Sequence, residues 1–273
     1  MSVQRRNNVH VRGAGPITVV FAHGFGCDQR MWRLVEPAFA PACRTVLFDL
    51  VGSGESDASQ YDSEKYSSLE GYAQDIIDVI DEFGEGRILF VGHSVSAMAG
   101  AVAAIRRPGL IDAHAMIGPS PCYLNDGAYP GGFSREDIDS LLDALESNYL
   151  GWSSAMAPSI MGNEDKPELG IELTDSFCRT DPDIAKRFAR VTFLSDCRDT
   201  VARLKAPTLI VQSSEDFIAA VAVGEYLAQT IENSRLDIIE NVGHCPHMSQ
   251  PQACIASIQR FIRDTWGTAE HGV

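Results

Sequence analysis

The segment Arg87-Ile-Leu-Phe-Val-Gly92-His93-Ser94-Val95-Ser96-Ala97-Met-Ala-Gly100-Ala decides the fold class of this chain. Its first part is a run of large apolar residues, typical of a buried strand, and its last part is a run of small residues of helical length. Between them, Gly92-x-Ser94-x-Ser96 predicts a turn so tight that its flanking residues must be small, although serine replaces the usual second glycine. Such a turn exposes the Ser94 hydroxyl at the carboxyl end of the strand and directs the N–H groups of the helix toward a reacting carbonyl group.

Further apolar runs rich in β-branched residues predict the strands of a mostly parallel sheet. These runs cover residues 17–22, 44–48, 88–91, 113–117, 208–211 and 236–239. Stretches of helical length separate several of them, at residues 69–83, 97–107, 221–231 and 251–266. The alternation of strands and helices is typical of a doubly wound α/β fold.

The alternation stops in the middle of the chain, where the apolar spacing is helical throughout. Ser134-x-x-Asp137 predicts the start of one helix and Asp181-Pro182 the start of another. We therefore expect one α/β core, residues 1–122 and 199–273, interrupted by a helical insertion at residues 123–198. Insertions after the carboxyl ends of strands commonly cover a ligand crevice, so we expect a lid; the alternative is a helical addition that only adds stability.

Composition excludes several classes of function. The 273 residues include 22 Lys and Arg against 37 Asp and Glu, and the net charge of −15 disfavours binding to nucleic acid or anionic membranes. No apolar run approaches the roughly 18 residues that span a bilayer, and the N-terminal stretch lacks the apolar segment of a signal peptide. The 7 cysteines have no CxxC spacing and cannot all pair, so we expect free thiols, no zinc site and a cytoplasmic location.

A serine hydroxyl is a weak nucleophile at neutral pH and needs an adjacent base, which in turn needs a group that fixes its orientation. Asp216 follows one predicted strand and His244 follows the next. The order serine, acid, histidine along the chain therefore predicts a catalytic triad of Ser94, Asp216 and His244.

Two neighbouring residues compete for these roles. Glu215 directly precedes Asp216 and could supply the carboxylate instead. His247 could act as the base in place of His244. We favour His244 because Gly243 gives its loop the freedom that a projecting imidazole needs.

A second backbone motif, Phe21-Ala-His23-Gly24-Phe25-Gly26, follows the first strongly apolar strand. Its spacing suits a loop whose N–H group points at a developing oxyanion. We expect the backbone N–H groups of Phe25 and Val95 to form the oxyanion hole, with the Phe25 ring at the wall of the pocket. The histidines His23 and His93 are expected to stabilise turns.

A third glycine-containing stretch, Asp49-Leu-Val-Gly52-Ser-Gly54-Glu-Ser56, follows the second predicted strand. It lacks the G-x-G-x-x-G spacing of a dinucleotide site, and no helix begins at once behind it, so we interpret it as a structural turn. No metal or other cofactor is required by the predicted chemistry.

The motifs HGFG (23–26), DLVGSGESD (49–57), GHSVS (92–96), the loop around Asp216 and GHCPH (243–247) occur in this order, and the chain resembles the α/β-hydrolase superfamily over its whole length. Stretches 118–126, 148–152, 177–182 and 193–196 resemble the RsbQ-like branch, which includes the bacterial sigma-B stress regulator RsbQ and the plant strigolactone and karrikin receptors. The resemblance implies the α/β-hydrolase fold with a lid of four helices over a mostly apolar pocket, and it favours Asp216 over Glu215. It also implies the pocket residues Phe25, Phe133, Trp152 and Phe193.

The chain departs from the common pattern of this family at Ala220, where a proline is usual. We expect this difference to change the stiffness of the loop more than its chemistry.

Two functions from different classes follow. The first is a serine hydrolase acting on a small, mainly hydrophobic ester or lactone; a serine nucleophile disfavours the aspartate-based branches, whereas haloperoxidases and carbon–carbon hydrolases share the triad. The second is a stress-signalling receptor that binds or slowly processes a small hydrophobic ligand and, as the resemblance to RsbQ implies, acts with a PAS-domain phosphatase. A hydrolase that has lost its activity and serves as a scaffold is the third alternative.

Overall fold

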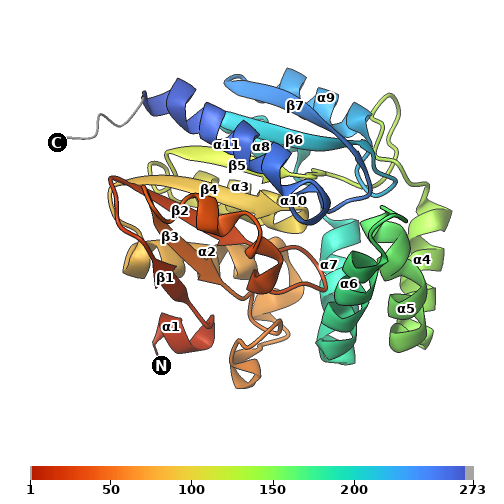
Figure 1. Ribbon diagram of the computed structural model, residues 1–273. Helices are drawn as coiled ribbons and strands as arrows, with labels where there is room; N and C mark the ends of the chain where they lie inside the picture. Colours follow the sequence, from red (N-terminus) through yellow and green to blue (C-terminus); the bar gives the residue numbers. More distant parts are fainter. Residues whose placement is uncertain (1, 268–273) are drawn as a thin grey trace.

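A mostly parallel sheet forms the centre of the molecule. The computed structural model describes residues 2–267, and within them a seven-stranded sheet has the order β1-β3-β2-β4-β5-β6-β7 (Figure 1). Its strands are β1 (His10–Arg12), β2 (Ile17–Ala22), β3 (Arg44–Phe48), β4 (Arg87–His93), β5 (Ala113–Ile117), β6 (Thr208–Glu215) and β7 (Ser234–Val242). Only β1 pairs in the antiparallel direction among these strands, with β3. The predicted α/β fold with a mostly parallel sheet is confirmed.

Both faces of the sheet are apolar, because successive side chains of a strand point to opposite faces. In β2, Val19 and Phe21 pack into one hydrophobic core, and Val20 and Ala22 pack into the other. The core that contains Val20 and Ala22 is covered mainly by α2 (Leu69–Phe83), α3 (Val95–Arg106), α8 (Arg198–Val201) and α9 (Val221–Thr230). The core that contains Val19 and Phe21 is covered on the sheet by α11 (Pro251–Trp266). Helices on both faces bury the central strands β2, β4 and β5 almost completely, as their continuous apolar runs predict.

The helical insertion lies at one side of this core, between β5 and α8 (Figure 1). Residues 123–198 contain the helices α4 (Arg135–Ser147), α5 (Tyr149–Met161), α6 (Pro167–Arg179) and α7 (Pro182–Leu194). The predicted helix starts are confirmed. Ser134 and Asp137 form a reciprocal capping box, and the Asp181 carboxylate accepts two N–H groups of the first turn of α7.

The apolar patterns of the sequence do not predict the elements β1 and α1, and they predict β6 and β7 too short. The strand β1 has three exposed residues, and the helix α1 (Val3–Arg6) has no buried residue, so neither leaves a hydrophobic signal. The strands β6 and β7 continue beyond their predicted apolar runs, because the backbone ladder extends into polar residues at their carboxyl ends. Short connecting helices complete the described chain: η1 (Gln29–Trp32), η2 (Glu36–Ala38), η3 (Ala58–Gln60), η4 (Lys65–Ser67) and α10 (Pro246–Ser249).

Two further expectations can be compared with the structure. All seven cysteines lie in the described part of the chain and are free thiols. Among residues 2–267, no helix has the length and apolar content that crossing a bilayer requires.

Two helical glycines predict opposite effects on stability. A Cβ atom at Gly100 in α3 would overlap the ring of Phe90, whereas a Cβ atom at Gly170 in α6 would lie 3.4 Å from Pro158, an ordinary contact. We expect Gly100→Ala to lower the free energy of unfolding by about 1–3 kcal/mol through overpacking. Gly170→Ala should raise it by up to about 1 kcal/mol, because alanine favours the helix. Urea denaturation of both variants measures the two changes, and a shift of the same sign in both would contradict this account.

The buried His114 predicts acid sensitivity of the fold. Neither ring nitrogen has a hydrogen-bond partner among the described residues, and burial lowers the pKa of His114 to about 4. The unfolded chain binds this proton below its ordinary pKa of about 6.5, so the free energy of unfolding falls as pH drops from about 6.5 to about 4. His114→Leu should flatten this decline by as much as about 1.4 kcal/mol per pH unit. Urea denaturation across this pH range measures the effect. The exposed His10 provides the control variant His10→Leu, which removes an imidazole from the surface rather than from the interior.

Candidate active site

The tight turn between β4 and α3 positions Ser94. Its φ of 54° and ψ of −123° lie in a region that non-glycine residues rarely adopt. A Cβ atom at Gly92 would lie 2.7 Å from the backbone nitrogen of Ala97, so this position requires glycine. Ser96 stands where a second glycine is usual, and its buried hydroxyl donates to the carbonyl oxygen of His23. Serine is therefore accommodated here by a bond that ties the turn to the loop after β2.

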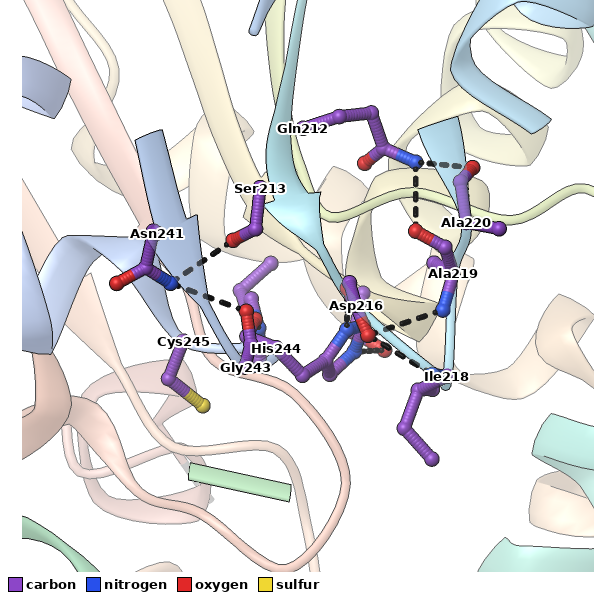
Figure 2. Close-up of polar contacts among 12 residues, drawn as sticks. Gln212, Ser213, Asp216, Ile218, Ala219, Ala220, Asn241, Gly243, His244 and Cys245 are labelled. Carbon is purple, nitrogen blue, oxygen red and sulfur yellow. Dashed lines mark hydrogen bonds and ion pairs between the residues drawn. The ribbon is translucent and has the colours of Figure 1, made fainter. Parts of the chain in front are cut away.

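Three side chains from separate loops form a continuous chain of hydrogen bonds. The Ser94 hydroxyl lies 2.9 Å from Nε2 of His244, and Nδ1 of His244 lies 2.6 Å from Oδ2 of Asp216. The other Asp216 oxygen accepts the backbone N–H groups of Ile218 at 2.8 Å and Ala219 at 3.1 Å (Figure 2). The carboxylate is thus held from both sides, and the imidazole is oriented to take the serine proton.

The two competing side chains lie elsewhere. Glu215 is exposed to solvent. His247 is fully buried, and its ring lies 4.6 Å from that of Trp32 and 4.5 Å from that of His93. Burial lowers the pKa of His247 to about 3, so this ring stays neutral. The structure therefore brings Asp216 and His244, rather than these two residues, to the serine.

The loop after β6 is supported by a buried amide. The side chain of Gln212 donates to the carbonyl oxygens of Ala219 at 3.1 Å and Ala220 at 3.2 Å (Figure 2). These two bonds hold the segment that supplies the N–H groups to Asp216. The loop therefore has a side-chain support at the position where the family usually has a proline.

The backbone groups predicted for the oxyanion hole lie on either side of Ser94. Val95 is the first residue of α3, so its N–H group has no partner within the helix. The loop that carries Phe25 is fixed by His23, whose Nδ1 donates to the carbonyl of Gly24 and whose Nε2 accepts the N–H group of Leu50. The imidazole therefore has a structural role, as expected. The use of the N–H groups of Phe25 and Val95 as an oxyanion hole stays a prediction.

A narrow cavity of about 30 Å³ adjoins Ser94 and His244. Three of the four predicted aromatic residues, Phe25, Trp152 and Phe193, line it. Phe133 is not part of the lining of this cavity among the described residues, and its contact with a substrate stays a prediction. Its backbone pairs with that of Tyr123 and its ring lies 6.4 Å from the Tyr123 ring, so tyrosine occupies the wall instead. The remaining lining residues are Cys27, His93, Tyr123, Ile160, Leu173, Phe177, Thr192, Ile218 and Cys245.

Sequence reasoning did not select two aromatic residues of this wall. The Tyr123 hydroxyl lies 3.4 Å from the Ser94 oxygen, and burial raises the pKa of Tyr123 to about 12, so it keeps its proton. The Phe177 ring stacks on Trp152, with centroids 6.0 Å apart, and meets Phe25 edge-on at 5.6 Å. Both residues lie in stretches that carry the family resemblance, which was the available signal.

Fold and site together define the class of α/β hydrolases. The chain belongs to this family, because the model of the Alpha/beta hydrolase family matches residues 19–257. It is 39% identical to the Karrikin insensitive 2 receptor CA of Petunia hybrida, over 95% of this chain and 97% of that protein. It is 36% identical to the Strigolactone esterase D14 of Arabidopsis thaliana, over 94% of each chain. The solved structure of a hydrolase from Oleispira antarctica shares 41% identity and a TM-score of 0.93, covering 96% of both chains. These relatives place the chain among enzymes named esterases and hydrolases, with close homology to the plant strigolactone and karrikin receptors.

The two adjacent carboxylates provide a matched test of the acid. Asp216→Asn keeps the shape of the side chain but removes the charge that orients and stabilises the His244 imidazole, so we expect kcat to fall about 10⁴-fold. Glu215→Gln removes a solvent-exposed charge and should leave kcat within about twofold of the original protein. Steady-state hydrolysis of a chromogenic short-chain ester measures both. A comparable loss in both variants, with folding intact by circular dichroism, would contradict the assignment.

Proposed function

We propose that this chain is a serine hydrolase that cleaves a small, mainly apolar ester or lactone. The observation that carries the proposal is the hydrogen-bonded series Ser94, His244 and Asp216 beside a cavity with aromatic walls. An apolar wall favours an uncharged substrate, since a charged group would lose its hydration without gaining a partner. The esterases among the relatives agree with this class of reaction.

The proposed reaction proceeds in two steps. The Ser94 oxygen attacks the substrate carbonyl carbon while Nε2 of His244 takes its proton, and the N–H groups of Phe25 and Val95 stabilise the oxyanion. His244 then protonates the leaving alcohol, which departs and leaves an acyl-serine. Water attacks this ester with His244 again as the base, and the Ser94 oxygen takes the proton from His244 as the acid is released. Asp216 keeps the imidazole in the required tautomer and stabilises its charged form.

The helical insertion, residues 123–198, acts as the lid of this site. The cavity volume of about 30 Å³ is far below the roughly 300–1,000 Å³ of an ordinary ligand pocket, so the closed site is too small for an ester. The rings of Trp152 and Phe177 from the insertion and Phe25 from the core close it. Substrate entry therefore requires these helices to move away from the core, and closure afterwards excludes bulk water.

A second candidate function is a receptor that processes its ligand slowly. The 39% identity to a petunia receptor over nearly the whole chain supports it, as does a cavity that must open for every exchange of ligand. The resemblance of the insertion to the RsbQ-like branch adds three predictions: a PAS-domain phosphatase as partner, a part in stress signalling, and a cytoplasmic location.

A pre-steady-state experiment tests these proposals. The original protein and Ser94→Ala are mixed with a chromogenic short-chain ester, and product release is followed together with the intact mass of the protein. Sustained turnover that depends on Ser94 is the result expected of the hydrolase. A stoichiometric burst followed by near silence, with an acyl group on the protein, supports the receptor. Equal behaviour of both proteins without an adduct overturns the role of Ser94.

A further inference from the structure

The hydrogen-bonding groups of His244 have partners from three separate segments of the chain. Its ring bonds Asp216 and Ser94, as described above. Its carbonyl oxygen accepts Nε2–H of His93, the residue before the nucleophile, at 3.0 Å. Its backbone N–H group donates to the carbonyl oxygen of Ile160, at 2.8 Å, in the last turn of the insertion helix α5. The insertion is thus bonded directly to the backbone of the histidine.

The end of α5 lies against the histidine loop, residues 243–245, which follows β7. At two positions of this contact the backbones are so close that only glycine fits. A Cβ atom at Gly243 would overlap the carbonyl oxygen of Met161, and a Cβ atom at Gly162 would lie 2.5 Å from the carbonyl oxygen of Val242. Both glycines have positive φ, 106° and 62°. The two backbones therefore interlock, and a small displacement of α5 must displace the loop as well.

One side chain fastens this contact from the insertion. The amide nitrogen of Asn163 donates to the carbonyl oxygens of Met161, at 3.0 Å, and of Val242. Asn163 has a φ of 56°, a conformation that asparagine tolerates better than most residues. Lys166 adds a second link, since its ammonium group donates to the carbonyl oxygen of Ser249 at 2.7 Å.

The core holds the other side of the histidine loop. The buried Asn241 donates to Ser213 Oγ at 3.0 Å and to the carbonyl oxygen of Gly243 at 3.1 Å (Figure 2). Its own carbonyl oxygen accepts the Ser249 hydroxyl at 2.7 Å. The N–H group of Gly243 donates to the carbonyl oxygen of Glu215 at 2.7 Å. The loop is therefore held between two supports, one fixed to the sheet and one belonging to the insertion.

We propose that Asn163 is a positioning residue that holds His244 in line with Ser94 when the insertion is seated on the core. This inference rests on the proposed hydrolase function and deepens it. Opening the insertion to admit a substrate loosens the bonds of α5 to the histidine loop, and closing it restores them. Closure therefore completes the catalytic geometry as well as covering the substrate.

Three variants test the proposal. Asn163→Gly permits the positive φ and removes the amide, whereas Asn163→Asp keeps the shape and replaces the donor by an acceptor that faces two carbonyl oxygens. Glu164→Gln changes the exposed neighbouring residue and is the control. With the chromogenic ester, we expect both Asn163 variants to lower kcat about tenfold with KM within about twofold, because the histidine is misplaced while the cavity wall is intact. Glu164→Gln should match the original protein.

Two further readouts do not depend on turnover. The first is the rate at which a fluorophosphonate modifies Ser94, which reports on the serine and histidine pair; it should fall about tenfold in both Asn163 variants. The second is the downfield proton NMR resonance of the hydrogen between Nδ1 of His244 and Asp216, which should broaden in these variants and persist in Glu164→Gln. All assays are made well below the lowest melting temperature among the original protein and its variants.

The outcomes separate this proposal from the proposed function. Unchanged kcat, modification rate and NMR resonance in folded Asn163 variants overturn the positioning role, whatever the original protein hydrolyses. A loss confined to KM also overturns it, because that result indicates a role in the cavity wall alone. If the original protein shows no turnover that depends on Ser94, the hydrolase proposal fails, and the modification rate and the resonance still decide the role of Asn163.

Discussion

The strained backbone of Ser94 is the constraint on which the rest of the site depends. A positive φ at a serine is maintained only because β4 on one side and α3 on the other are buried and cannot relax. The small residues around the turn follow from the same constraint, since Gly92 leaves no room for a side chain next to the helix. In a parallel sheet, the carboxyl ends of neighbouring strands meet at this edge, and the loops that carry Asp216 and His244 begin there.

The insertion contacts both loops that surround the nucleophile. The helix α5 bonds the histidine loop through the carbonyl of Ile160. The helix α6 bonds the loop that carries Phe25, because the Ser176 hydroxyl donates to the carbonyl oxygen of Gly26 at 2.9 Å. Because α5 and α6 pack against each other, motion of this helical hairpin would displace the loops of His244 and Phe25 together. Both proposed functions, hydrolysis and ligand-dependent signalling, would then depend on the same physical event, the seating of the insertion on the core.

Two buried histidines next to the site, His93 and His247, are neutral. Burial lowers the pKa of His93 and His247, so neither carries a charge near neutral pH. The His93 ring lies between the other two, with centroids 5.0 Å from that of His244 and 4.5 Å from that of His247. Of these three rings, only His244 bonds a carboxylate in the described structure. The His93 ring thus supports the backbone of His244 through a hydrogen bond and adds no charge beside it.

Local patterns in the sequence determined the elements and their order. Apolar runs located six of the seven strands, the segment around Ser94 located the tight turn between β4 and α3, and capping residues located the starts of two insertion helices. Each of these features depends on neighbours along the chain. Tertiary structure alone decided which side chains meet. It set His244 rather than His247 against the serine, it placed Tyr123 rather than Phe133 at the cavity wall, and it joined Asn163 to the histidine loop. The physical reason is that periodicity fixes the direction of a side chain relative to its own element, whereas contacts between distant loops depend on how whole elements pack.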